Sequence, residues 1–216
     1  MELACRNLTE KPSEANLVKL LDLWSTEWKH QGRTRAVGPG AFDKYCTLGL
    51  FGHGGVCGVS NATARQAACA AVNHFLKSRF PQGAWASIAV LFNPHMGLHR
   101  DIQNMIGQPN HAIALGEFSG GRVWIEDDEG ESTAWLEDKK GGRELRGRWL
   151  DMHDKPVSFE ARILLYIACD IPAAPICEQD VSIVCSKTAR RVEVRNQIRK
   201  LVQTPWVSSL TVGYDP

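Results

Sequence analysis

His99 and Asp101 are separated by one residue and follow an apolar segment at residues 85–92. In an extended strand the side chains of residues i and i+2 point to the same face. The imidazole and the carboxylate can therefore meet at one point, with Arg100 turned away. A histidine and a carboxylate on one side of a metal ion, with other positions open, are typical of two-histidine, one-carboxylate iron sites. The spacing predicts that His99 and Asp101 are metal ligands and catalytic residues.

The residues after this pair have the pattern of two strands joined by a tight turn. Residues 111–118 are mostly apolar, Gly120 and Gly121 favour a turn, and a second apolar segment follows. The order of His-x-Asp, apolar strand and Phe118-Ser-Gly-Gly-Arg-Val-Trp124 resembles the core of the 2-oxoglutarate and Fe(II)-dependent dioxygenase superfamily. The resemblance is to a divergent branch of that superfamily and covers about residues 45–170.

This resemblance implies an α+β fold with a double-stranded β-helix core of the jelly-roll or cupin-like type, and N-terminal helices packed on it. It also implies the cofactors Fe(II) and 2-oxoglutarate, and hydroxylation of a substrate with release of succinate and carbon dioxide. Asn104 matches the last residue of an H-R-D-x-x-N motif. It can orient Asp101 through a hydrogen bond, or it can simply form a turn.

The third metal ligand has two readings. In the first, His153 is that ligand and Arg162, nine residues later, binds the far carboxylate of 2-oxoglutarate, a task that suits the guanidinium group. In the second, residues 153–162 match a segment that precedes the second histidine of the family. The segment with that histidine is then missing, and two ligands remain.

Two main functions follow from these readings. With His153 as a ligand, the chain is an Fe(II)- and 2-oxoglutarate-dependent oxygenase of unknown substrate. Without a second histidine, the chain is a degenerate dioxygenase-fold domain that serves as a non-catalytic binding or structural module. A cupin-like metal enzyme that ignores 2-oxoglutarate is a further alternative. Surface loops choose the substrate in such folds, so the sequence does not name it.

The composition of the chain indicates no particular class of binding partner. The chain has 216 residues, a net charge of +1, 44% hydrophobic residues and 23% charged residues, as expected of one globular domain. No apolar run approaches the roughly 20 residues that span a bilayer, which predicts no membrane partner. Seven cysteines without C-x-x-C spacing favour a reduced, intracellular protein, either cytoplasmic or nuclear.

Helical patterns precede the candidate site. Residues 1–44 are expected to form a loose end at 1–12, a helix capped by Ser13 that runs to about Lys29, and a loop. Residues 46–60 indicate a short strand broken by glycines. A second helix is expected from a cap at Ser60 or Asn61 to Phe80, where Pro81 ends it.

Strand patterns fill the rest of the 45–170 domain, with a charged hairpin tip or loop at residues 138–147. Strands are expected near residues 85–92, 111–118, 121–126, 132–136, 146–150, 156–160 and 162–169.

Residues 171–216 are expected to form a basic C-terminal tail. Within it, residues 186–204 can make one amphipathic helix with arginines and a lysine around an apolar stripe. Such a helix can bind an acidic partner, so nucleic acid stays open as a partner. Alternatively it is a solvated helix packed on the domain, or a loose tail. The oligomeric state does not follow from the sequence.

Overall fold

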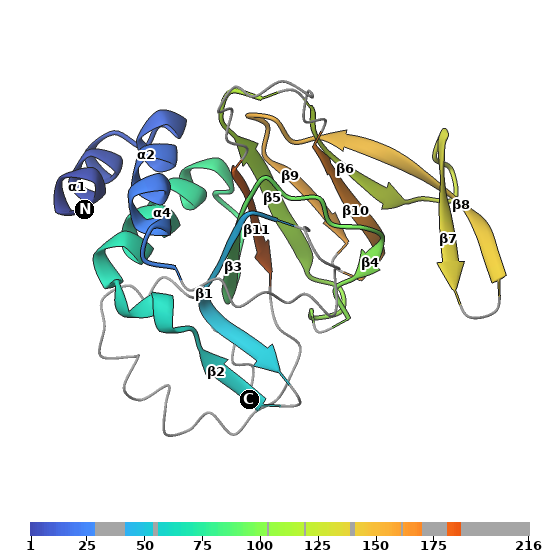
Figure 1. The fold of residues 1–216 in the computed structure, drawn as a ribbon, viewed down its shortest axis with the longest axis horizontal. Coiled ribbons are helices and arrows are strands. Elements are labelled where there is room, and N and C mark those ends of the chain that lie inside the picture. The colour runs from blue at the N-terminus through green and yellow to red at the C-terminus, as the bar shows by residue number, and fades with distance from the viewer. Residues whose placement is uncertain are drawn as a thin grey trace.

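The computed structural model describes residues 1–28, 42–53, 56–102, 104–118, 120–138, 141–160, 162–169 and 181–186. Their helices are α1 (Glu2–Glu10), α2 (Glu14–Ser25), the 3-10 helix η1 (Asn61–Ala64) and α4 (Gln66–Arg79). Figure 1 shows these helices grouped on one side of the strands. None of the helices in this part of the chain is long and apolar enough to cross a membrane.

The expectation of a loose end at residues 1–12 is wrong, because α1 occupies most of that segment. Ala4, Cys5 and Leu8 form one buried face of this helix, with Leu8 fully buried. Leu8 lies three residues after Cys5 and four after Ala4, so the three side chains fall on one side of a helix. The sequence signal was short, and packing against the neighbouring helices stabilises it.

The two predicted helices are present with adjusted ends. The Ser13 hydroxyl accepts a hydrogen bond from the backbone N–H of Asn16 at 3.4 Å, which caps α2 as expected. The Ser60 hydroxyl caps η1 in the same way, and the longer helix α4 begins only after Arg65. The apolar residues that helical spacing places on one face of α4 are buried, namely Ala68, Ala71, Val72, Phe75 and Leu76.

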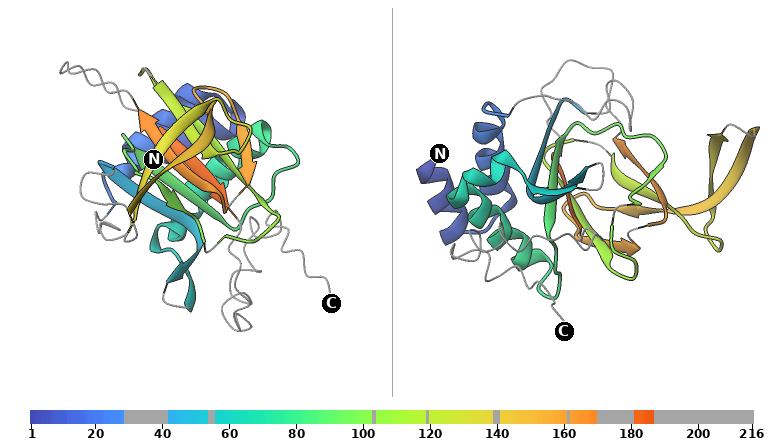
Figure 2. Two further views of the ribbon diagram at one scale, coloured as in Figure 1. Left: turned by 90° about the vertical axis from the view of Figure 1, so that its right-hand side faces the viewer. Right: turned by 90° about the horizontal axis from the view of Figure 1, so that it is seen from below.

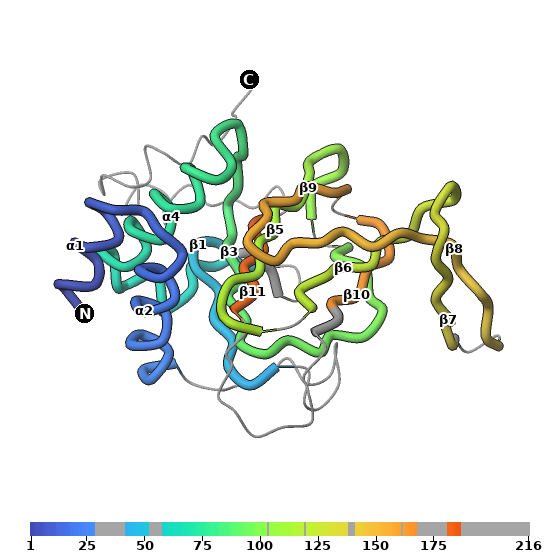
Figure 3. The backbone as a smooth tube through the Cα atoms, turned by 90° about the horizontal axis from the view of Figure 1, so that it is seen from above, coloured from blue at the N-terminus to red at the C-terminus, as the bar shows by residue number. Residues whose placement is uncertain are grey.

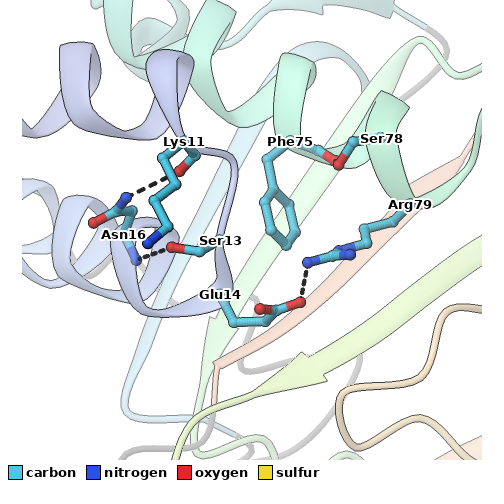
Figure 4. Close-up of polar contacts among 7 residues, drawn as sticks. All are labelled: Lys11, Ser13, Glu14, Asn16, Phe75, Ser78 and Arg79. Atoms are coloured by element: carbon cyan, nitrogen blue, oxygen red, sulfur yellow. Dashed lines mark hydrogen bonds and ion pairs between the residues drawn. The ribbon is translucent and has the colours of Figure 1, made fainter.

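An ion pair ties α2 to α4. The Arg79 guanidinium contacts the Glu14 carboxylate and lies over the Phe75 ring, with its central carbon 5.0 Å from the ring centroid. Figure 4 shows this contact beside the start of α2, where the Asn16 side chain also donates to the Lys11 carbonyl. The start of α2 is thus held to both neighbouring helices.

The described strands form two sheets, and all neighbouring strands in them are antiparallel. The six-stranded sheet has the order β2-β1-β3-β11-β5-β9, and the five-stranded sheet has the order β4-β10-β6-β8-β7. The bounds are β1 Lys44–His53, β2 Val56–Val59, β3 Ser87–Phe92, β4 His99–Arg100, β5 Pro109–Leu115, β6 Gly120–Glu126, β7 Ser132–Asp138, β8 Gly141–Asp151, β9 Val157–Glu160, β10 Leu164–Cys169 and β11 Val181–Ser186.

The seven strands predicted after residue 85 are present in the expected order, with shifts at their ends, and the structure adds β4 and β11, which the sequence did not predict. The largest shift concerns the charged segment 138–147, because β8 begins at Gly141 and takes most of it. The strands β7 and β8 form a hairpin that projects from the body of the molecule (Figures 1 and 3).

The strand β11 lies in the middle of the six-stranded sheet, between β3 and β5. It falls in the segment 171–216 that the sequence assigned to a tail, so the predicted boundary at residue 170 leaves out a central strand. Val181, Ile183 and Cys185 are fully buried. The helix expected at residues 186–204 lies outside the described residues, apart from its first.

The core has three layers of apolar side chains. One cluster joins the helices to a face of the six-stranded sheet. A second joins Ala112, Ala114 and Phe159 of that sheet to Val123 and Leu165 of the five-stranded sheet. A third cluster around Trp124 covers the outer face of the five-stranded sheet. Figure 2 shows the resulting order of helices, first sheet and second sheet. The predicted α+β class and the packing of N-terminal helices on the strands are confirmed.

Candidate metal centre

His99 points into the space between the two sheets. In the pairing of β4 with β10, Leu165 lies opposite His99 and Leu164 lies opposite Arg100. Opposite residues of an antiparallel pair share a face, and Leu165 belongs to the intersheet cluster. The side chain of His99 is accordingly 16% exposed and that of Arg100 is 44% exposed.

The imidazole of His99 has one nitrogen engaged and one turned toward Asp101. Its Nδ1 lies 2.8 Å from the carbonyl oxygen of Gly97. A carbonyl only accepts hydrogen bonds, so this contact assigns the proton of the neutral ring to Nδ1. The lone pair of Nε2 is then available to a ligand, and Nε2 lies 3.9 Å from Oδ1 of Asp101.

Two asparagines hold the other oxygen of Asp101. The Nδ2 group of Asn110 donates to Oδ2 at 3.1 Å, and Nδ2 of Asn104 lies 3.4 Å from the same atom. Asn104 also donates to Oδ1 of Asn110 at 3.0 Å. The structure therefore brings together His99, Asp101 and Asn104 from the predicted set, and adds Asn110. An asparagine at the start of an apolar strand was the available signal for that residue.

His153 does not join this group. Its backbone is bridged to Ala114 of β5, whereas Asp101 is bonded to Asn110 of the same strand. Four residues of a strand span about 13 Å. A histidine and a carboxylate that share a metal must both lie about 2 Å from it. His153 thus lies too far along the sandwich to share a metal with His99 and Asp101.

The pairing in the five-stranded sheet gives the same separation between His153 and the pair of His99 and Asp101. A Cβ atom on Gly121 would lie 3.1 Å from Cβ of His153, so His153 is beside the start of β6. Leu165, the partner of His99, pairs with Ile125 near the end of β6. The separation is again four strand residues, about 13 Å. The reading in which His153 is the third metal ligand is therefore wrong.

The surroundings of His153 are those of a packed structural residue. Its ring is tilted against Phe118, with the centroids 4.3 Å apart, and its Nε2 lies 3.2 Å from the carbonyl oxygen of Gly116. The nine-residue spacing between His153 and Arg162 does not bring the two residues to one site, because β9 lies between them. This strand leads the chain from the His153 end of the sandwich to the opposite end.

Arg162 is half-buried in the connection between β9 and β10. Glu160, at the end of β9, pairs with Pro109 beside Asn110, and Leu165 in β10 pairs with His99. The connection therefore lies at the His99 and Asp101 end. The structure separates Arg162 from His153 and places it in the neighbourhood of the candidate site.

Among the described histidines, His111 also lies outside this centre. His111 lies 2.8 Å from the Ser158 hydroxyl through Nδ1, and its ring contacts Phe80 and Trp85 near the helices. The side chain of His53 is outside the described residues.

The donor set is compatible with a divalent cation and does not make up a complete iron site. Two metal bonds of about 2.1 Å can span the gap between Nε2 of His99 and Oδ1 of Asp101. Across the described ranges, no group of three or more histidine, cysteine, aspartate or glutamate side chains could hold a metal. On the neighbouring strand β10, the residue opposite His99 is Leu165, which is apolar, 3% exposed and has no donor atom for a metal.

The loop that follows Asp101 exposes large apolar side chains. Ile102 is 62% exposed, Met105 is 42% exposed and Ile106 is 72% exposed. Exposed apolar residues that gather at one place are typical of a surface that contacts a ligand or partner. The polar pair and this apolar loop are adjacent in the sequence.

The sequence matches no protein-family model and no curated relative. Among solved structures, it is similar to one described as NgTET1 in complex with 5mC DNA. The TM-score is 0.42 at 10% identity, over 86% of this chain and 76% of that one. A similarity at this level assigns neither a family nor an activity.

Proposed function

We propose that this chain is a degenerate dioxygenase-like domain that binds a ligand through a two-residue cation site at His99 and Asp101, without oxygenase turnover. The observation that carries the proposal is the pairing of His99 with Leu165. A metal ligand from the adjacent strand would have to come from this position. Leucine offers no donor atom, and His153 lies at the other end of the sandwich.

The strand order supports a double-stranded β-helix as the fold of this domain. From β3 to β6 and again from β8 to β11, successive strands alternate between the two sheets. The exception is the hairpin of β7 and β8, which stays within one sheet. Alternation of eight strands between two facing sheets is the arrangement of a jelly roll.

The proposed site uses one nitrogen and one oxygen. Nε2 of His99 and Oδ1 of Asp101 would hold the cation, while Gly97 and the asparagines fix the two side chains. A bound divalent cation would supply positive charge that attracts an anionic group of a ligand. Arg162 would add a second positive charge at the same end of the sandwich. The exposed side chains of Ile102, Met105 and Ile106 would contact an apolar part of that ligand.

A cobalt(II) titration of the purified chain tests this proposal. Wild type should bind weakly, and Asp101→Ala should lose binding. Leu165→His would place a second imidazole beside His99 and should tighten binding by about tenfold or more, since residues that merely orient a ligand already contribute about 10- to 100-fold. His153→Ala is the control and should leave affinity unchanged. An unchanged affinity in Leu165→His, or a loss in His153→Ala, would overturn the proposal.

The second candidate is an active oxygenase, and the position of Arg162 favours it. Its third ligand would have to come from outside the described residues. Anaerobic addition of Fe(II) and 2-oxoglutarate tests this candidate, through a weak metal-to-ligand absorption band and release of succinate once oxygen is admitted. Succinate release above that of Asp101→Ala would support the enzyme and refute the binding module.

A further inference from the structure

Among the described polar residues at this end of the sandwich, Asn110 is the most deeply buried. It lies on β5 and is 0% exposed. It shares the face of Ala112 and Ala114, since residues two apart in a strand point the same way, and these alanines belong to the intersheet cluster. A buried amide needs partners for its donor and acceptor groups. Those partners are the site residues themselves.

The hydrogen bonds of Asn110 leave its amide one orientation. Its Oδ1 accepts from Nδ2 of Asn104 at 3.0 Å, so its own Nδ2 is turned to Oδ2 of Asp101 at 3.1 Å. If the amide were flipped, the two NH2 groups would face each other and Oδ1 would face the carboxylate. The backbone N–H of Asn104 also donates to the carbonyl of Asp101 at 2.9 Å, and this bond holds Asn104 in place beside Asp101.

The two oxygens of Asp101 therefore have different partners. Both amide donors are directed at Oδ2. Oδ1 is left facing Nε2 of His99. A carboxylate held in this way presents one oxygen to a cation and keeps its orientation when no cation is bound. Residues that orient a ligand in this manner strengthen metal binding without touching the metal.

We propose that Asn110 is the positioning residue that sets Asp101 as a one-oxygen ligand of the cation site. This inference rests on the proposed cation site. Asn104 plays the smaller part, because its contact with Asp101 is longer, 3.4 Å against 3.1 Å. Asn104 and Asn110 contact each other, so the effects of removing them are not additive.

The test is a cobalt(II) titration followed by visible absorption, using the full chain. Asn110→Leu should weaken binding by about 10- to 100-fold and should change the absorption spectrum of bound cobalt, because Asp101 is free to bind through both oxygens. Asn110→Ser gives a second variant should leucine prevent folding, and it should weaken binding in the same direction. Asn104→Ala should weaken binding less than either.

Ser182→Ala is the matched control. Ser182 is also 0% exposed and lies on the adjacent strand β11, where it pairs with Ala114, away from Asp101. This variant should keep both the affinity and the spectrum of wild type. An affinity and spectrum unchanged in both Asn110 variants would overturn the positioning role, provided that Asp101→Ala loses binding. If Asp101→Ala and His99→Ala bind cobalt as wild type does, the proposed cation site itself is wrong.

Discussion

His99 and Leu165 are direct partners across the β4–β10 ladder, and both side chains face the interior between the sheets. Opposite Cβ atoms in such a pair lie about 4.5–5.5 Å apart. A pair of histidines at these positions would be spaced to share one metal. The chain has a histidine on one strand and a leucine on the other, and this pairing leads us to propose a cation-binding domain in place of an oxygenase.

Removal of the carboxylate should abolish cation binding at a modest cost in stability. Asp101→Ala deletes Oδ1 and leaves the buried Nδ2 of Asn110 without its acceptor. An unsatisfied buried donor costs about 1–3 kcal/mol. Urea unfolding without metal should therefore show a loss of that size, and a titration should show no cation binding. Complete unfolding of this variant would mean that Asp101 is mainly a structural residue.

Gly121 should tolerate no side chain. Its φ is +74°, and a Cβ atom would lie 2.8 Å from the Phe118 ring. The left-handed conformation costs an L-residue about 1–2 kcal/mol, and overpacking adds about 1–3 kcal/mol. Gly121→Val should cost more than Gly121→Ala, because a branched Cβ meets the same ring. Thermal unfolding of each variant gives the measurement.

Two other glycines distinguish the cost of the left-handed backbone from the cost of the contact with Phe118. Gly107 has a φ of +70° but no neighbour within 4 Å of an added Cβ, so Gly107→Ala should show the conformational cost alone. Gly97 has neither feature, and Gly97→Ala should be almost neutral. Equal losses in Gly121→Ala and Gly107→Ala would show that the Phe118 contact is unimportant.

His153 should contribute to stability and not to the site. His153→Ala removes a ring that packs on Phe118 and approaches the Gly116 carbonyl. Loss of such a half-buried contact should lower the free energy of unfolding by about 1–2 kcal/mol, with cation affinity unchanged. His99→Ala should show the reverse pattern, since its side chain belongs to the site. Calorimetry and titration on the same samples distinguish the two outcomes.

Buried thiols should make the protein less stable at high pH. Burial raises the pKa of the Cys46 and Cys69 thiols from 9.0 to about 12. Above pH 9 the unfolded chain releases these protons while the folded chain still holds them, so unfolding is favoured as pH rises toward 12. The free energy of unfolding should therefore fall across this window.

Other groups also titrate at high pH, so the thiols need their own control. A Cys46→Ala, Cys69→Ala double variant should show a flatter decline between pH 9 and 12, whatever its stability at neutral pH. Urea midpoints measured at several pH values give this slope. A decline as steep as that of wild type would assign the effect to other groups.

Local patterns in the sequence determined much of the fold. The capping serine at position 13, the apolar face of α4 and the alternating segments after residue 85 act over a few neighbours, so they predicted helices and strands in the right order. The i and i+2 spacing likewise sufficed to predict that His99 and Asp101 meet, because it depends only on the geometry of a short extended segment. α1 was missed because its apolar face is short and is stabilised by the helices it packs on.

Only the tertiary structure decided which distant residues meet. His153 and Arg162 are nine residues apart in the sequence, but β9 leads the chain from one end of the sandwich to the other, so the two do not share a site. Leu165 and Asn110 reach His99 and Asp101 through strand pairing and packing between the sheets. The strand β11 enters the centre of the six-stranded sheet from a segment that reads as a tail. Pairing register and strand order depend on the whole set of strands, so spacing along the chain does not determine them.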